Sequence, residues 1–222
     1  MSSKMLILVG SPKKGGGVSQ AVADHLGASI RSSGGEAEIV NVLGLLEEPS
    51  GIDRLISEWV SSDVVVLSFP LYVDSPPGGV IRMFELLAAR KEGLEGKRSM
   101  LAIGNCGNPD PAKLDVSVAI CRNFARHMGM HWLGGLRMPM GQAWEGRSIT
   151  GSGRPGRHVR KALELTSAAL VGGEEVPKAA FEDMSSRLMP EFLYIMRVNR
   201  DMKRRSKASG ARMRMNDRPY GR

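Results

Sequence analysis

Residues 10–19 carry side chains and glycines of the kind that bind phosphate groups. The segment reads GSPKKGGGVS, which combines glycines, hydroxyls and lysines between an apolar run and a helical pattern. Glycine lets the backbone curl without Cβ clashes, and the start of the next helix offers free N–H groups to an anion. Ser11 and Ser19 would be further donors. The segment contains neither GxxxxGK[ST] nor GxGxxG, and a flexible turn with a serine helix cap is the alternative.

Residues 68–77, SFPLYVDSPP, follow a second strongly apolar run. Leu71, Tyr72 and Val73 are apolar where a solvent-facing loop should be polar. A flat heteroaromatic ring could lie against them and be hydrogen-bonded by backbone groups. The alternative is that Tyr72 only covers the edge of the core.

Residues 105–111, NCGNPDP, follow a third apolar run. Asn105, Gly107 and Asn108 offer donors to a ring carbonyl or nitrogen. A Pro/Asn turn that ends a strand would look similar. The three segments together are more informative than any one of them, because each follows an apolar run that reads as a strand.

The elements that position these segments alternate between strands and helices. Short apolar or alternating runs predict strands at 5–9, 36–42, 63–69, 99–103 and 130–136. Helical periodicity predicts helices at 19–33, 52–60, 76 onward, 112–127 and 157–171. For the helix at 112–127 we expect an inner face of Val116, Ile120 and Phe124.

This alternation predicts an α/β protein with a five-stranded, doubly wound parallel sheet in the flavodoxin-like order 2-1-3-4-5. In such sheets ligands bind outside the carboxyl ends of the strands, at the switch point between strands 1 and 3. The three segments follow strands 1, 3 and 4, so they converge on that crevice. We expect residues 1–175 to form this domain and residues 176–222 to form a C-terminal helical extension.

Composition and charge restrict the alternatives. The chain has 222 residues, 42% of them hydrophobic, which suits one compact domain with an appendage. No apolar run approaches the roughly 20 residues of a membrane-spanning helix, and we expect a cytoplasmic protein. Cys106 and Cys121 are too few for a disulfide-rich scaffold. Residues 1–196 hold 21 Lys/Arg and 21 Asp/Glu, whereas residues 197–222 hold 10 and 2, so the net charge of +8 lies in the C-terminal tail.

On the segments GSPKKGGGVS, SFPLYVDSPPGGVIRMFELL and NCGNPD, the sequence resembles the flavodoxin-like NAD(P)H-dependent FMN oxidoreductases over residues 4–172. The resemblance implies a bound FMN, with one group of residues at the phosphate and two groups around the isoalloxazine ring. The phosphate group is Ser11, Lys13 and Ser19; the ring groups are Pro70, Leu71, Tyr72, Val73 and Asp74, and Asn105, Cys106, Gly107 and Asn108. Family members often have Arg where Lys13 stands and a hydroxyl residue where Val18 stands.

The resemblance also implies the chemistry. NAD(P)H would pass a hydride to the flavin, and the reduced flavin would deliver electrons to a quinone, nitro compound, metal ion or protein. No acid or base side chain is required, so we expect no catalytic side chain. Cys106 is either a redox-active thiol or, as we expect, a small packing residue.

His127 and His131 are four residues apart but flank Gly129, so they would not share a helix face, and we expect no metal site. Residues 134–156 form a long segment with Met138, Met140 and Trp144. It would serve as a lid, a dimer contact or a plain surface loop.

The C-terminal tail supports competing interpretations. An apolar stretch at 188–198 precedes a cluster of Lys and Arg. We expect the apolar stretch to pack on a partner subunit in a dimer or tetramer. A binding module for nucleic acid or an anionic membrane surface is the alternative, and a flavodoxin-type electron carrier is another, although the body is neutral rather than acidic.

Overall fold

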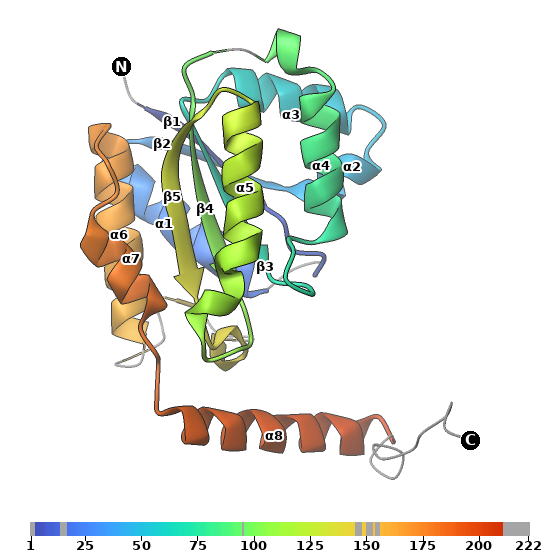
Figure 1. Cartoon of the computed structure of the whole chain (residues 1–222), viewed down its shortest axis with the longest axis vertical. Coiled ribbons are helices and arrows are strands. Elements are labelled where there is room, and N and C mark those ends of the chain that lie inside the picture. The colour runs from blue at the N-terminus through green and yellow to red at the C-terminus, as the bar shows by residue number, and fades with distance from the viewer. Residues whose placement is uncertain are drawn as a thin grey trace. The chain divides into compact units, whose positions relative to one another are not determined.

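A computed structural model describes residues 3–13, 17–94, 96–144, 148–149, 153 and 156–210. The chain divides into two compact units, Met1–Leu188 and Met189–Arg222. The first contains a five-stranded parallel sheet in the order β2-β1-β3-β4-β5, which confirms the predicted fold (Figure 1). Its strands are β1 (Lys4–Val9), β2 (Glu36–Asn41), β3 (Val64–Pro70), β4 (Ser99–Asn105) and β5 (His131–Met138).

Helices cover both faces of the sheet in the first unit (Figure 1). One face carries α1 (Val18–Ser32), α6 (Arg157–Gly172) and α7 (Lys178–Ser185), and the other α2 (Val42–Glu47), α3 (Gly51–Val60), α4 (Gly78–Ala88) and α5 (Asp115–His127). Short 3₁₀ turns lie at η1 (Lys91–Gly93), η2 (Pro111–Leu114) and η3 (Gly141–Trp144). The second unit contains α8 (Glu191–Ala208). None of the helices in these described ranges is both long and apolar enough to cross a lipid bilayer.

The core forms because β1 and β3 are apolar almost throughout and therefore suit burial on both faces. Leu6, Leu8, Val65 and Leu67 are fully buried. On the α3–α5 side, the rings of Phe84 and Phe124 stack with centroids 3.9 Å apart, and Trp59 meets Phe124 edge-on at 6.2 Å. These contacts fix the central strands, and with them the loops that follow the strands.

The inner face predicted for the helix at 112–127 is wrong at its start. The side chain of Val116 is 57% exposed, whereas Val118, Cys121 and Ala125 are buried together with Phe124. The buried residues follow the i, i+3, i+7 spacing of a helix stripe. The predicted series took every fourth residue, which drifts around a helix of 3.6 residues per turn.

The last strand is longer than predicted, because β5 continues to Met138 and takes in the first part of the segment that the sequence suggested was a loop. Gly134 and Gly135 explain why the strand looked weak. A Cβ on Gly134 would lie 2.5 Å from the Phe181 ring of α7, and one on Gly135 would lie 2.2 Å from the Val118 side chain of α5. The two glycines therefore let a helix approach closely on each face of the strand.

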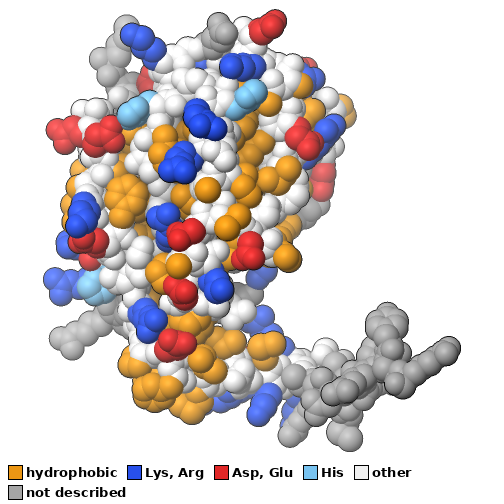
Figure 2. Space-filling model, in the orientation of Figure 1, with side chains coloured by type: hydrophobic (Ala, Val, Ile, Leu, Met, Phe, Trp, Pro, Cys, Tyr) orange, Lys and Arg blue, Asp and Glu red, His pale blue; other side chains and the backbone are white. Residues whose placement is uncertain are grey.

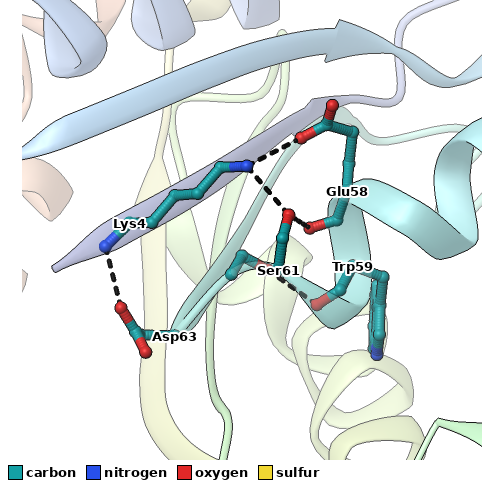
Figure 3. A network of polar contacts seen from close by, with 6 residues as sticks. Lys4, Glu58, Trp59, Ser61 and Asp63 are labelled. Carbon is teal, nitrogen blue, oxygen red and sulfur yellow. Dashed lines mark hydrogen bonds and ion pairs between the residues drawn. The ribbon is translucent and has the colours of Figure 1, made fainter.

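A polar network ties the amino ends of β1 and β3 to the end of α3 (Figure 3). Lys4 donates its backbone N–H to Asp63 at 2.8 Å, and its Nζ donates to Glu58 at 3.1 Å and to Ser61 Oγ at 2.8 Å. The network lies at the edge of the sheet opposite to the three segments singled out in the sequence. Its role is therefore to hold the sheet together.

Helix α7 is held against α6 by Asp183. One carboxylate oxygen lies 3.0 Å from His158 Nδ1 and the other 2.8 Å from Lys161 Nζ. The hydrogen bonds from Lys161 and then His158 hold the pKa of the Asp183 carboxyl below its usual range. The folded state therefore favours the charged carboxylate.

Replacing Asp183 with Asn should lower the free energy of unfolding at pH 7 by about 0.5–1 kcal/mol, because its partners are half exposed. In the wild type this stabilisation is fully present above the unfolded-state pKa of about 3.9 and is lost as pH falls through the lower folded-state pKa. Urea unfolding from neutral pH to pH 3 measures both. The neighbouring variant Glu182→Gln is the control, and an acid dependence of Asp183→Asn equal to that of the wild type would contradict this account.

Candidate functional site

The register of the sheet brings the carboxyl ends of β1, β3 and β4 together. Val9 pairs with Ser68, and Pro70 pairs with Asn105. The three segments predicted to converge therefore start next to one another. The three segments differ in burial and in their hydrogen bonds.

The first segment leads from β1 into α1. Ser11 and Ser19 are buried, whereas the Lys13 side chain is exposed, and the Lys13 backbone N–H donates to Ser11 Oγ at 3.3 Å. Gly17 is the N-cap of α1, has no side chain to cap the helix, and is followed by a first turn without acidic residues. Residues 14–16 lie outside the described residues. The start of α1 is thus suited to an external anion.

Gly17 also shapes this segment as a cradle. A Cβ at position 17 would lie 3.3 Å from Ser11 Oγ and 3.7 Å from Lys13 Cβ. The absence of a side chain leaves that space beside the backbone N–H groups of the helix start. A phosphate group fits this donor set, because it carries several acceptor oxygens and no donor at neutral pH.

The second segment makes a tight turn after β3. Tyr72 and Ser75 exchange backbone hydrogen bonds of 2.9 and 3.1 Å, and Val73 and Asp74 between them have φ angles of 49° and 61°. Two consecutive positive φ angles are the signature of a type I′ turn, which favours Asn and Gly. Val73 is β-branched, so its backbone is strained there. Strain at one loop of a candidate site points to a constrained role for the turn.

The residues of the second segment differ widely in burial. Pro70 ends β3 and is half-buried, as is Leu71. Tyr72 is 46% exposed and Val73 is 97% exposed, and Asp74 is also exposed. The turn thus presents two large apolar side chains to its surroundings, and such exposure is characteristic of a surface that contacts something else.

The third segment is pinned by the backbone of the chain beyond β5. Gly141 N–H donates to the Cys106 carbonyl at 2.7 Å, and Met140 N–H donates to the Asn108 carbonyl at 2.9 Å. Cys106 is buried, whereas Gly107 and Asn108 are exposed. The exposed pair remains accessible to a ligand at this edge of the sheet.

Both cysteines are buried thiols. Burial raises the pKa of the Cys106 thiol, which donates weakly to the Asn108 carbonyl at 3.5 Å. Burial raises the pKa of Cys121 to about 12. Neither side chain is therefore a thiolate at neutral pH, and the packing interpretation of Cys106 is the one that its surroundings favour.

Asn105 connects all three segments. Its Nδ2 donates to Ser19 Oγ at 2.8 Å and to the Phe69 carbonyl at 2.9 Å. Its own carbonyl accepts the Leu71 N–H at 2.8 Å, and its side chain is almost fully buried. Hydrogen bonds in such a buried place are strong and costly to lose. The Asn105 amide thus sets the spacing between the start of α1 and the loop after β3.

Ser68 is a site residue that the sequence reasoning missed. It is fully buried, and its Oγ donates to the Ser19 carbonyl at 3.0 Å, which adds a second link between β3 and the start of α1. Its signal was a lone hydroxyl in the otherwise apolar strand of residues 64–70. A buried polar residue implies a specific partner.

Residues 134–156 are predicted to form a lid, a dimer contact or a surface loop. The first part of this segment is packed into the first unit. Met138, Met140 and Trp144 are buried, and the described residues offer no partner to the indole N–H of Trp144. Trp144 belongs to η3, which hydrogen-bonds to the third segment, so this donor lies beside the candidate site without a partner among the described residues. Residues 145–147 and 150–152 lie outside the described part. Of the two histidines considered for a metal, His127 ends α5 and His131 begins β5, and Nε2 of His131 pairs with Glu175 at 2.7 Å.

The family model described as NADPH-dependent FMN reductase matches residues 3–145, whereas a search of curated proteins found no match.

Solved structures show the same fold at low identity. A putative quinone reductase from Klebsiella pneumoniae is 13% identical with a TM-score of 0.64 over 79% of this chain and 88% of its own. An NADH:FMN oxidoreductase (EMOB, apo form) is 14% identical with a TM-score of 0.60 over 85% and 97%. Rubredoxin oxygen:oxidoreductase from Desulfovibrio gigas is 11% identical with a TM-score of 0.54 over 82% of this chain, which spans only 37% of that protein's length.

Proposed function

The chain belongs to the family of NADPH-dependent FMN reductases, and we propose that it transfers a hydride from NAD(P)H through FMN to a quinone, nitro compound, metal ion or protein. FMN is the cofactor and NAD(P)H the electron donor of an enzyme of this family. The acceptor and the site residues are our proposal. So is the cytoplasmic location expected from the sequence.

The phosphate end of the cofactor is assigned to the start of α1. Gly17 leaves the backbone N–H groups of the first helical turn open, and Ser11 and Ser19 add hydroxyls. Lys13 contributes a positive charge from the solvent side. The helix dipole and these donors favour a dianion at this point.

The ring end is assigned to the second and third segments. The strained turn at Tyr72–Ser75 supplies an apolar border with backbone groups, and residues 105–108 supply amide and backbone donors on the other side. FMN, when bound, supplies the redox chemistry. The side chains orient the ring and exclude water, and no side-chain acid or base is needed.

The observation that carries this proposal is the double hydrogen bond of the Asn105 amide. It sets the distance between the phosphate cradle and the ring loop through Ser19 and Phe69. A rigid cofactor with a phosphate at one end needs both ends held in a fixed relation. A plain surface turn would not need a buried amide with two partners.

The acceptor class is tested by steady-state NADPH and NADH oxidation with FMN-loaded protein. A benzoquinone, a nitroaromatic compound, a ferric chelate and a cytochrome are offered in turn. We expect turnover with at least one of them, with rates that saturate in the acceptor. Rapid reduction of the bound flavin by a flavoprotein reductase, with none by either nucleotide, would instead establish an electron carrier.

A further inference from the structure

Helix α8 carries five of the exposed large apolar side chains among the described residues, whereas α3 and α5 carry one each. Phe192 is 68% exposed and Met196 59%, and Leu193 and Ile195 are also exposed. With Tyr194 they form five consecutive apolar residues, which we call the apolar collar. Five residues exceed one helical turn, so the collar is apolar on every side; Tyr194 is already buried, and the other four side chains are exposed. A helix that is apolar all round is normally buried in protein.

The basic residues of α8 are separated from the collar along the helix axis (Figure 2). Residues 191–196 contain no Lys or Arg, whereas residues 197–208 contain six, against Asp201 alone. A helix that lies on an anionic membrane instead carries its apolar and basic residues on opposite faces along its whole length. The axial separation therefore favours a protein partner for the collar, with the basic part of the helix beyond it.

The first unit has a surface that complements α8 in polarity and charge. Four of its described large apolar side chains are exposed, and three of them, Tyr72, Val73 and Val116, come from the loops and helix start that follow β3 and β4. The exposed acidic residues Asp74 and Asp110 belong to the same loops, and one exposed base, Lys113, lies between Asp110 and Val116. An apolar patch with acidic neighbours suits an apolar collar followed by basic residues.

We propose that the apolar collar of α8 docks on the Tyr72–Ser75 turn of a second copy of this chain. Each copy has both a collar and a turn, so the collar of each copy can dock on the turn of the other. The two equivalent contacts then form a closed two-fold dimer. The turn would then border the flavin on one side and the partner helix on the other. The dimer itself does not depend on the proposed function, so it is tested with and without FMN.

Cross-linking between two distinguishable copies tests the contact. A tagged Val73→Cys chain and an untagged Phe192→Cys chain are co-expressed and treated with a short bismaleimide. We expect a cross-linked species that contains one tagged and one untagged chain. Tagged Val60→Cys, an exposed valine at the opposite edge of the sheet, is the matched control and should give none. Wild-type chains give the background from the two buried native cysteines.

Light scattering during gel filtration tests the energetics. The wild type should have the mass of two chains, and the double variant Phe192→Ser/Met196→Ser should dissociate about 100-fold more readily, because each buried apolar anchor contributes at least a factor of ten. Arg200→Gln/Arg204→Gln should remain dimeric. A monomeric wild type, equal cross-linking through Val60→Cys, or a monomer that binds phosphatidylserine vesicles through the two arginines would each overturn the proposal. FMN retention is measured separately, so its loss would count against the proposed function alone.

Discussion

Replacing Asn105 with alanine is expected to lower the free energy of unfolding by about 2–3 kcal/mol and to weaken FMN binding at least tenfold. The substitution removes the donor shared by Ser19 Oγ and the Phe69 carbonyl, both of which are buried. Each unsatisfied buried polar group costs about 1–3 kcal/mol. Urea unfolding and flavin fluorescence quenching measure the two effects.

The matched control for Asn105 is Asn123→Ala, which makes the same chemical change at an exposed position of α5. It should change stability by less than about 0.5 kcal/mol. If Asn105→Ala fails to fold, Ser19→Ala removes only one of the two partners and should show a smaller loss of both stability and affinity. Equal stability of the Asn105 and Asn123 variants would refute the role of Asn105 in joining the segments.

The second large effect is expected at Gly17, where one substitution should weaken FMN binding without lowering the stability of the fold. Gly17→Asp should leave the free energy of unfolding unchanged or raise it by about 0.5 kcal/mol, because Asp is a good N-cap and a negative charge suits a helix start. It should weaken FMN binding about 100-fold or more. A carboxylate about 4 Å from a phosphate charge repels it by about 4 kcal/mol at an effective dielectric constant of about 20.

Gly17→Ala is the steric control for this prediction. It introduces the same Cβ, which would sit 3.3 Å from Ser11 Oγ, but it adds no charge and should lose far less affinity. Riboflavin, which lacks the phosphate, is the matched ligand. The Gly17→Asp and Gly17→Ala variants should bind riboflavin with equal affinity. If Gly17→Asp bound FMN with the affinity of the wild type, the assignment of the FMN phosphate to the start of α1 would be wrong.

The sheet could be predicted from the sequence because its signals are local. The apolar runs of β1 and β3 and the helix between them determine a parallel arrangement with few alternatives. Parallel strands place their carboxyl ends at one edge, so the meeting of the three segments followed from strand order alone.

The connections within the site could not be predicted in the same way. That Asn105 reaches Ser19 and Phe69 depends on the register of β3 and β4, and the sequence does not state that register. The positive φ angle of Val73 also contradicts local preference, because valine disfavours the turn that it occupies, whereas Asp74 tolerates such an angle. Such conflicts between local preference and structure are expected at functional sites.

The weaker elements show how tertiary packing overrides sequence patterns. Gly134 and Gly135 made the fifth strand look weak, but they are the reason that α7 and α5 can approach β5. Val116 read as core, but the stripe that faces the sheet starts at Val118. In both cases the partner element, rather than the local residues, decides the outcome.

The most direct test of the central claim is an anaerobic titration of the purified protein after incubation with FMN and desalting. The account predicts that the protein retains the flavin and that NADPH or NADH bleaches its visible absorbance with a saturable rate. The Gly17→Asp variant, folded but without flavin, should show no such signal. A wild-type protein that retains no FMN, or a bound flavin that neither nucleotide reduces, would contradict the account.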